Sequence, residues 1–238
     1  MAGKTTTVTV IGTLKGGVGK TRLAMMSALY LATVKGRRVH VIDGDTISQT
    51  AYDWQRDAKA AHAKAAAHGR PTGPAWPVTV ERHPFEDIDE YIDRVVAGGD
   101  VDDVIADIGG GNRAVLEAAL TRAKRFMAPV GADSSELRKL PATWKVARTA
   151  AADSVVGGFA AYVVLSRTDH NTTLPKEARD SLTTELEAAG KEPYPLCETE
   201  LVRRVAYQRA YGLVPRDYLD IPALLAEVGM VDAAEVSA

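Results

Sequence analysis

The apolar positions of the chain fall in short runs that favour buried strands, each followed by a longer stretch with helical periodicity. The first run, Val8 to Ile11, is β-branched and stops at Gly12, and Leu23 to Leu31 then has the apolar density of a buried helix. This alternation predicts an α/β fold, a doubly wound and mostly parallel sheet with helices on both faces. Further strands are predicted at 38–43, 77–81, 101–107, 125–130, 158–166 and 193–197, helices at 49–68, 85–96, 112–122, 134–152 and 174–189, and a loop at 69–77.

The length and composition suit a single domain over residues 1–238, since 46% hydrophobic and 25% charged residues are typical of globular proteins. Cys197 is the only cysteine, which excludes a disulfide framework and a C-x-x-C metal site. No signal peptide or apolar run of membrane-spanning length is present, so we expect a cytoplasmic protein without membrane contact. The net charge of −2 means that any binding of nucleic acid would depend on a local basic patch.

A glycine-rich loop, K-G-G-V-G-K-T, joins the first predicted strand to the first predicted helix at residues 15–21. Glycines let backbone N–H groups turn toward phosphates, and the helix N-terminus adds a partial positive charge. We expect Lys20 to contact the β- and γ-phosphates of a nucleotide and the Thr21 hydroxyl to contact Mg²⁺. The alternative is a chance glycine-rich turn, which the strand–loop–helix context disfavours.

Three aspartates are predicted at the carboxyl edge of the same sheet, where open α/β folds bind their ligands. Asp43 ends the second strand and Asp45 follows it, while Asp107 ends an apolar strand and precedes Gly109, Gly110 and Gly111. The bland alternative for Asp43 and Asp45 is a pair of loop-capping carboxylates. Asp107 alone is a weak signal, but it gains weight because it follows a phosphate-binding loop.

The loop resembles the deviant Walker A box of the ParA/MinD ATPase family, because Lys15 stands directly before the glycine pair. The D-x-D of Asp43 and Asp45 resembles the second motif of this family, and Asp107 with its glycines resembles the Walker B strand and glycine switch. The likeness covers nearly the whole chain and is strongest to the small single-domain ParA-type partition ATPases. In that family the extra lysine reaches the nucleotide of the partner subunit, the first aspartate lies near Mg²⁺ and the second orients the attacking water.

The resemblance implies an enzyme, a Mg²⁺-dependent ATP hydrolase that forms a homodimer on ATP and binds DNA non-specifically. It also implies a ParB-type centromere-binding partner that stimulates hydrolysis, a role in plasmid or chromosome segregation, and a cytoplasmic, nucleoid-associated location. The sequence departs from the family pattern at Leu14, Arg22 and Thr46. ATP binding is still expected, and the departures concern the rate of ATP turnover and the coupling of the switch loop to the nucleotide. The implied catalytic residues are Lys15, Lys20 and Asp45, the implied metal residues are Thr21, Asp43 and Asp107, and the implied nucleotide contacts are Lys15, Gly16, Gly17, Val18, Gly19, Lys20, Thr21, Arg22 and Arg167.

A cluster of arginines near the end of the chain, Arg203, Arg204 and Arg209, is the candidate DNA-binding patch, with Arg216 close by. Helical spacing would place Arg204 and Gln208 on one face. A second contribution is expected from Lys139, Lys145 and Arg148. The alternative is a solvated helix with ordinary surface arginines.

Other functions remain open at this stage. A ParA-like ATPase that positions a non-DNA cargo, such as a microcompartment or a chemoreceptor array, would use the same chemistry. An amidoligase or synthetase of the same fold would need a substrate pocket that the sequence does not locate. A non-enzymatic DNA-binding dimer would result if the three departures stopped turnover. A MinD-like membrane shuttle is disfavoured, because no lysine or arginine follows Arg216 to form a basic amphipathic helix.

Overall fold

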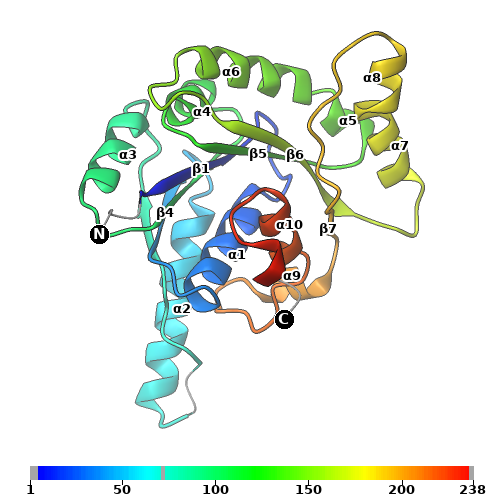
Figure 1. The fold of residues 1–238 in the computed structure, drawn as a ribbon. Helices are drawn as coiled ribbons and strands as arrows, with labels where there is room; N and C mark the ends of the chain where they lie inside the picture. The colour runs from blue at the N-terminus through cyan, green and yellow to red at the C-terminus, as the bar shows by residue number, and fades with distance from the viewer. Residues whose placement is uncertain (1–4, 71–72, 236–238) are drawn as a thin grey trace.

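The computed structural model describes residues 5–70 and 73–235. Within these residues, seven strands form one all-parallel sheet in the order β3-β2-β4-β1-β5-β6-β7 (Figure 1). This arrangement confirms the predicted fold class. Pro71 and Thr72 of the predicted loop 69–77 lie outside the described residues. The strands are β1 (Thr7–Gly12), β2 (Val39–Gly44), β3 (Thr79–Arg82), β4 (Asp103–Ile108), β5 (Arg125–Val130), β6 (Ala160–Thr168) and β7 (Leu201–Val202).

Helices cover both faces of the sheet, and each face has its own hydrophobic core. Alternate strand residues point to opposite faces, so that Ile11 and Ile105 enter one core while Val10 and Ala106 enter the other. Helices α1, α2, α9 and α10 pack on the first face, and α3, α4, α6 and α7 pack on the second (Figure 1). The helices are α1 (Lys20–Thr33), α2 (Thr50–Ala67), α3 (Ile88–Ala97), α4 (Arg113–Leu120), α5 (Ser134–Leu137), α6 (Leu140–Ala152), α7 (Leu174–Leu182), α8 (Thr184–Ala188), α9 (Val205–Arg209), α10 (Ile221–Glu227) and the 3-10 turn η1 (Ala233–Glu235).

Helix α2 is partly exposed. Its buried residues, Ala51, Trp54, Gln55 and Ala58, all lie in its N-terminal half. The C-terminal half, which is rich in alanine, extends past the edge of the sheet (Figure 1). The short strand β3 forms the edge of the sheet beside β2, and its first three residues alternate between exposed and buried.

Two predicted elements are wrong because of prolines. The helix predicted at 134–152 divides into α5 and α6, since Pro141 lies in the first turn of α6 and has no N–H to continue a helix from α5. The strand predicted at 193–197 makes one isolated bridge, from Leu196 to Val163, because Pro193 and Pro195 cannot donate to a ladder. The seventh strand is instead β7, which pairs with the end of β6.

Two further boundaries differ from the prediction. The helix predicted at 174–189 divides at Thr183, whose φ of −125° and ψ of −86° are not helical. Phe85 lies ahead of α3 and is 61% exposed, so its place in the apolar spacing does not reflect burial.

The central helix α1 supplies a test of this packing. Leu29 is fully buried against the first core. Replacing Leu29 with Ala should lower the free energy of unfolding by about 2–5 kcal/mol, because a buried cavity is left behind. Urea denaturation measures the change. Val155→Ala, at a side chain that is 65% exposed, is the control and should change the free energy of unfolding by less than about 0.5 kcal/mol. Equal effects of the two substitutions would contradict the packing.

Candidate functional site

The parallel register brings the three predicted motifs to one edge of the sheet. Strand β4 lies between β1 and β2, and Asp107 pairs with Ile11 on one side and Asp43 on the other. The glycine-rich loop leaves the end of β1 directly beside them. Asp43, Asp107 and the loop are therefore neighbours although they are far apart in the sequence.

The loop already has the shape of a phosphate cradle. Gly17 and Gly19 have φ values of 78° and 88°, a region that side chains other than glycine rarely adopt. Lys20 is 6% exposed, and its Nζ donates a hydrogen bond to the Lys15 carbonyl at 3.0 Å. The Val18 carbonyl accepts a hydrogen bond from the Ser166 hydroxyl at 2.7 Å, which fastens the loop to β6. Burial lowers the pKa of Lys20, while Asp107 and Asp45 act to raise it.

Leu14 takes the position where the general pattern has glycine, and the structure explains how the chain accommodates it. Leu14 has no positive φ, so its conformation does not require glycine. Its N–H donates to the Thr143 hydroxyl at 3.1 Å, which also lies 3.2 Å from the Thr13 hydroxyl. Its side chain packs against the second core. The backbone hydrogen bond thus anchors the start of the loop to α6, and the leucine side chain adds apolar packing at this position.

The two aspartates of D-x-D have different surroundings. Asp43 is fully buried and accepts hydrogen bonds from the N–H groups of Asp45 and Tyr52, at 3.1 and 2.9 Å. Burial raises the pKa of Asp43, and the two hydrogen bonds counteract part of the effect. Asp45 accepts hydrogen bonds from the N–H groups of Ile47 and Ser48 and from the Ser48 hydroxyl, at 2.8, 3.1 and 2.6 Å. Burial acts to raise the pKa of Asp45, but these bonds and the charge of Lys20 outweigh it, so that the pKa is lowered.

Asp107 is the most strongly perturbed carboxyl group of the site. Burial raises its pKa to about 7, even though Thr21 beside it and the charge of Lys20 act in the opposite direction. Neither carboxylate oxygen has a partner at hydrogen-bond geometry among the described residues. A buried carboxylate of this kind is stabilised by a cation or by water held on a cation.

The residues present fit a Mg²⁺ ion that is held mainly by phosphates and water. Thr21, Asp43 and Asp107 offer oxygen atoms, which Mg²⁺ prefers. Within residues 5–70 and 73–235 no group of three His, Cys, Asp or Glu side chains could hold a metal unaided. The site therefore suits an ion that arrives with a nucleotide rather than a resident metal.

The predicted glycine switch lies against both motifs. A Cβ on Gly109 would lie 2.7 Å from the Asp45 side chain, and one on Gly110 would lie 2.7 Å from the Gly16 nitrogen. Only glycine allows these approaches without displacing the backbone. Movement of the glycine-rich loop and of the Gly109–Gly110 segment is consequently coupled by direct contact.

A pocket of about 560 Å³ opens beside the loop, next to Gly19 and Arg22. Arg167, which directly follows the apolar run of β6, has a φ of 57° and forms an ion pair with the buried Glu136. Glu136 also accepts a hydrogen bond from the Gly131 N–H at 2.7 Å. Arg22 lies opposite Tyr207, and its Nε has no hydrogen-bond partner among the described residues.

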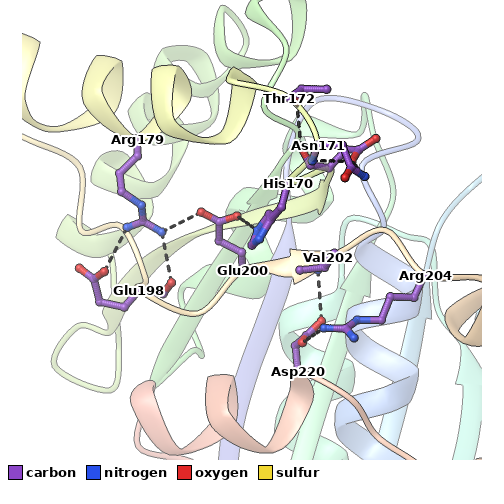
Figure 2. Close-up of polar contacts among 10 residues, drawn as sticks. His170, Asn171, Thr172, Arg179, Glu198, Glu200, Val202, Arg204 and Asp220 are labelled. Carbon is purple, nitrogen blue, oxygen red and sulfur yellow. Dashed lines mark hydrogen bonds and ion pairs between the residues drawn. The ribbon is translucent and has the colours of Figure 1, made fainter.

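Ion pairs hold the outer wall of this pocket in place. Arg179 contacts Glu200 at 3.1 Å, and His170 contacts the same carboxylate at 3.0 Å (Figure 2). Arg204 pairs with Asp220 at 2.9 Å, and Asp220 also accepts the N–H of Val202 (Figure 2). The loop after β6 and the segment around β7 are thereby tied to α7 and α10.

The structure divides the predicted DNA-binding arginines between two cavities. Arg203 and Arg204 line the pocket beside the glycine-rich loop, whereas Arg209 lines a separate groove. Arg204 and Gln208 do not share a helix, because Arg204 is extended, with φ −131° and ψ 143°, and α9 begins after it, yet both line the pocket beside the glycine-rich loop. In the second basic set, Lys145 and Arg148 belong to α6 on the opposite face of the sheet, and Lys139 directly precedes that helix.

Sequence reasoning missed part of the pocket. Glu136, Tyr207 and Gln208 line it, yet no local motif marks them, since they reach it only through long-range packing. Arg167 could be located because it directly follows the apolar run of a strand that ends at the functional edge.

Taken together, the sheet order, the phosphate-cradling loop and the aspartates at its edge define an α/β fold of the P-loop type. No family model matches the chain, and no curated protein matches it. Among solved structures, an ATP complex of a McdA variant from Cyanothece matches with a TM-score of 0.65 and 15% identity, over 95% of this chain and 98% of that one.

Two further solved structures show the range of proteins with this fold. Cobyrinic acid a,c-diamide synthase from Mycobacterium smegmatis, bound to an ATP analogue and magnesium, matches with a TM-score of 0.65 and 18% identity, over 93% and 95% of the two chains. A protein described as a plasmid partition protein from Borrelia burgdorferi, bound to AMPPNP, matches with a TM-score of 0.58 and 16% identity, over 92% and 98%. MinD structures match as well. The chain therefore has the fold of the ParA/MinD-type deviant Walker A ATPases.

The raised pKa of Asp107 predicts how stability depends on pH. In the unfolded chain this carboxyl group ionises near pH 4, whereas in the folded protein it ionises at about 7. Ionisation thus favours the unfolded chain between these values, and the free energy of unfolding should fall as pH rises from about 4 to 7, by about 4 kcal/mol at most. Asp107→Asn should remove most of this slope.

Urea denaturation at pH 5 and pH 8, with EDTA and without nucleotide, measures the effect. Asp107→Asn should stabilise the protein more at pH 8 than at pH 5. Asp102→Asn, at a partly exposed carboxylate that pairs with Arg38, is the control and should show no such gain at pH 8. A pH dependence that is the same in wild type and Asp107→Asn would contradict the assignment.

Proposed function

We propose that this chain is a Mg²⁺-dependent ATPase of the ParA type, which dimerises on ATP and is stimulated by a ParB-type partner. The observation that carries the proposal is the pair of lysines on one preformed loop. Lys20 is buried toward Asp107 and Asp45, while Lys15 is half-exposed on the outer part of the loop and forms no ion pair within the described residues. In this proposal one lysine contacts the phosphates of its own subunit, and the other contacts those of a second subunit.

Each residue of the edge has a role in this proposal. The N–H groups of the loop, from Gly16 to Gly19, and Lys20 hold the phosphates. The Thr21 hydroxyl, Asp43 nearby and Asp107 through water would hold Mg²⁺, and the ion would neutralise charge on the phosphate oxygens. Asp45 orients the attacking water, and Lys15 of the partner subunit offsets the charge that develops on the phosphates.

The nucleoside end of ATP has a place in the pocket of about 560 Å³ beside the loop. This pocket adjoins Gly19, so a nucleotide whose phosphates sit in the cradle would extend directly into it. Arg22 lies at the junction, and Arg167 is fixed on the far wall by Glu136. The ATP, AMPPNP and magnesium of the matching structures support ATP and Mg²⁺ as the ligands.

The cellular role that we propose is DNA partition in the cytoplasm, on the nucleoid, by a chain that forms a single domain over residues 1–238. The partition protein among the structural matches supports this role. One observation favours the alternative, a positioning ATPase for a non-DNA cargo. Arg203 and Arg204 line the pocket beside the loop, so the DNA patch loses two of its three arginines. None of the helices in the described part of the chain has the length and apolar character of a membrane span.

Two lysine variants test the ATPase proposal. Lys20→Ala should abolish ATP binding, because the buried amine that contacts the phosphates is lost. Lys15→Gln should retain ATP binding within about tenfold but lose ATP-dependent dimerisation and hydrolysis, as removal of an arginine finger does in related chemistry. Calorimetry, light scattering and phosphate release measure the three properties. Lys124→Gln, directly before β5 and so at the strand end opposite the loop, is the control. Normal turnover in Lys15→Gln would show that Lys15 is an ordinary surface residue.

A second test separates DNA from other cargo. ATP, and not ADP, should promote binding of duplex DNA regardless of sequence, and the affinity should fall steeply with salt. Changing Arg203, Arg204 and Arg209 together to Glu should abolish that binding. Arg209→Glu alone should weaken it while ATP affinity is retained, since Arg209 does not line the pocket beside the loop. Equal DNA binding with ADP and ATP would favour the non-DNA cargo, whereas undiminished binding in the triple variant would move the DNA site away from these arginines.

A further inference from the structure

A second cavity, on the same face of the sheet, has no role in the proposed ATPase chemistry. It is a groove of about 580 Å³ between the C-terminal half of α2, the loop around Trp76, and the segment from Ala206 to Asp217. One wall is a single face of α2, because Ala58, Ala61, His62 and Ala65 follow the i, i+3, i+4, i+7 spacing. We call this cavity the α2–α9 groove.

The floor and opposite wall of the α2–α9 groove are apolar. Leu213, Val214 and Pro215 line it, and Leu213 is 52% exposed. Trp76 closes one side, and its indole N–H has no hydrogen-bond acceptor among the described residues. Alanine side chains on the α2 wall leave room for close approach of another helix, so the surface has the shape that receives an apolar helix face.

The rim of the groove is basic. The sequence contains no Asp or Glu from Ala58 to Val80, nor from Leu201 to Arg216, and these two stretches supply both walls. Arg209 and Arg216 line the groove, and Lys59 and Lys64 lie on α2 at about 100° or more to either side of its alanine face. None of these four cations forms an ion pair in the part of the chain that the structure describes.

The acidic groups near the groove do not cancel this charge. Asp217 lines the groove and accepts the N–H of Leu219. Asp57, which lies 3.6 Å from the position of a Cβ on Gly212, is paired with Arg56. A net positive rim around an apolar floor is complementary to a helix with apolar residues on one face and carboxylates on the other. Nucleic acid would use the rim but offers nothing to the apolar floor, so a polypeptide is favoured.

The groove is connected to the candidate nucleotide site through both of its walls. The short helix α9 lies between the two cavities, since Tyr207 and Gln208 line the nucleotide pocket while Ala206 and Arg209 line the groove. Helix α2 begins beside Asp43, which accepts the Tyr52 N–H, and its far half forms the other wall of the groove. A ligand that separates or clamps these walls would act on elements that contact the nucleotide pocket and the aspartate.

We propose that the α2–α9 groove is the docking site for an acidic amphipathic helix of a partner protein, and that its occupation changes nucleotide release at the neighbouring site. The second half of this proposal rests on the proposed ATPase function, whereas the docking itself does not. The alanine face and Leu213 bury the apolar side of the helix, and Arg209, Arg216 and the α2 lysines pair with its carboxylates.

A selection from a displayed library of random peptides, each about 18 residues long and so able to form several helical turns, identifies binders of the wild-type protein. We expect the enriched peptides to carry apolar residues at i, i+3 or i+4 spacing together with Asp or Glu. Ala61→Trp fills the groove and should weaken their binding at least about tenfold. Ala65→Trp is a second groove-filling variant, and thermal melting checks the fold of both.

The matched control is Ala60→Trp, on the same helix turn but on the exposed side away from the groove, which should bind the peptides as the wild type does. Arg216→Glu should also weaken binding about tenfold, whereas Lys145→Glu on α6 should not. The docking site would be overturned if no peptides were enriched or if the enriched peptides lacked acidic residues. It would also be overturned if Ala61→Trp and Ala65→Trp bound the peptides as tightly as the wild type does. Displacement of the peptides by duplex DNA, together with loss of DNA binding in Ala61→Trp, would assign the groove to nucleic acid instead.

Coupling is measured by the release rate of a fluorescent ADP analogue. A selected peptide should change this rate about fivefold in the wild type and in Ala60→Trp, but not in Ala61→Trp, whose own nucleotide affinity should equal that of the wild type. An unchanged rate with saturating peptide would overturn the regulatory half. If the wild type bound no nucleotide while the peptides still discriminated between Ala60→Trp and Ala61→Trp, the ATPase proposal would fail and the docking site would stand.

Discussion

The structure depends on a group of buried charges at the carboxyl edge of the sheet. One amine, that of Lys20, lies among Asp43, Asp45 and Asp107, and burial shifts the pKa of Lys20, Asp43 and Asp107 toward their neutral forms. Such a group is tolerated only where the surrounding backbone is rigid and where a ligand completes the balance of charge. The all-parallel register provides the rigidity, because it fixes Asp43 beside Asp107 on adjacent strands.

Much of the fold and the site could be predicted from the sequence, because both depend on local sequence patterns. The apolar runs gave six of the strands, and the rule that parallel strands end at one edge placed Asp43 and Asp107 together. What could not be predicted depends on distant parts of the chain. Leu14 becomes intelligible only through Thr143 on α6, and Glu136 belongs to the pocket only through its ion pair with Arg167. Pro141 carried a local signal that helical periodicity outweighed in the prediction.

The arginines near the end of the chain illustrate the same limit. Arg203 and Arg204 are adjacent to one another in the sequence and close to Arg209, which favoured a single patch. The start of α9 at Val205 separates them, so that two line the pocket beside the glycine-rich loop and the third faces the α2–α9 groove. A partition protein and a diamide synthase share this fold although their activities differ. Surfaces away from the glycine-rich loop, such as the α2–α9 groove, are where proteins of one fold can acquire different partners.

In the proposed mechanism, the hydrogen bonds of Asp45 affect the rate of ATP hydrolysis rather than the affinity for ATP. All three of them close the turn that leads into α2, and this turn ends at Gln49, whose φ of 36° is uncommon for a residue with a side chain. If Asp45 is to aim its carboxylate at a water molecule, the turn must first open and release those bonds. Hydrolysis would then be limited by a backbone rearrangement. The ATP-bound state would persist until the turn opened, either spontaneously or on binding of a partner.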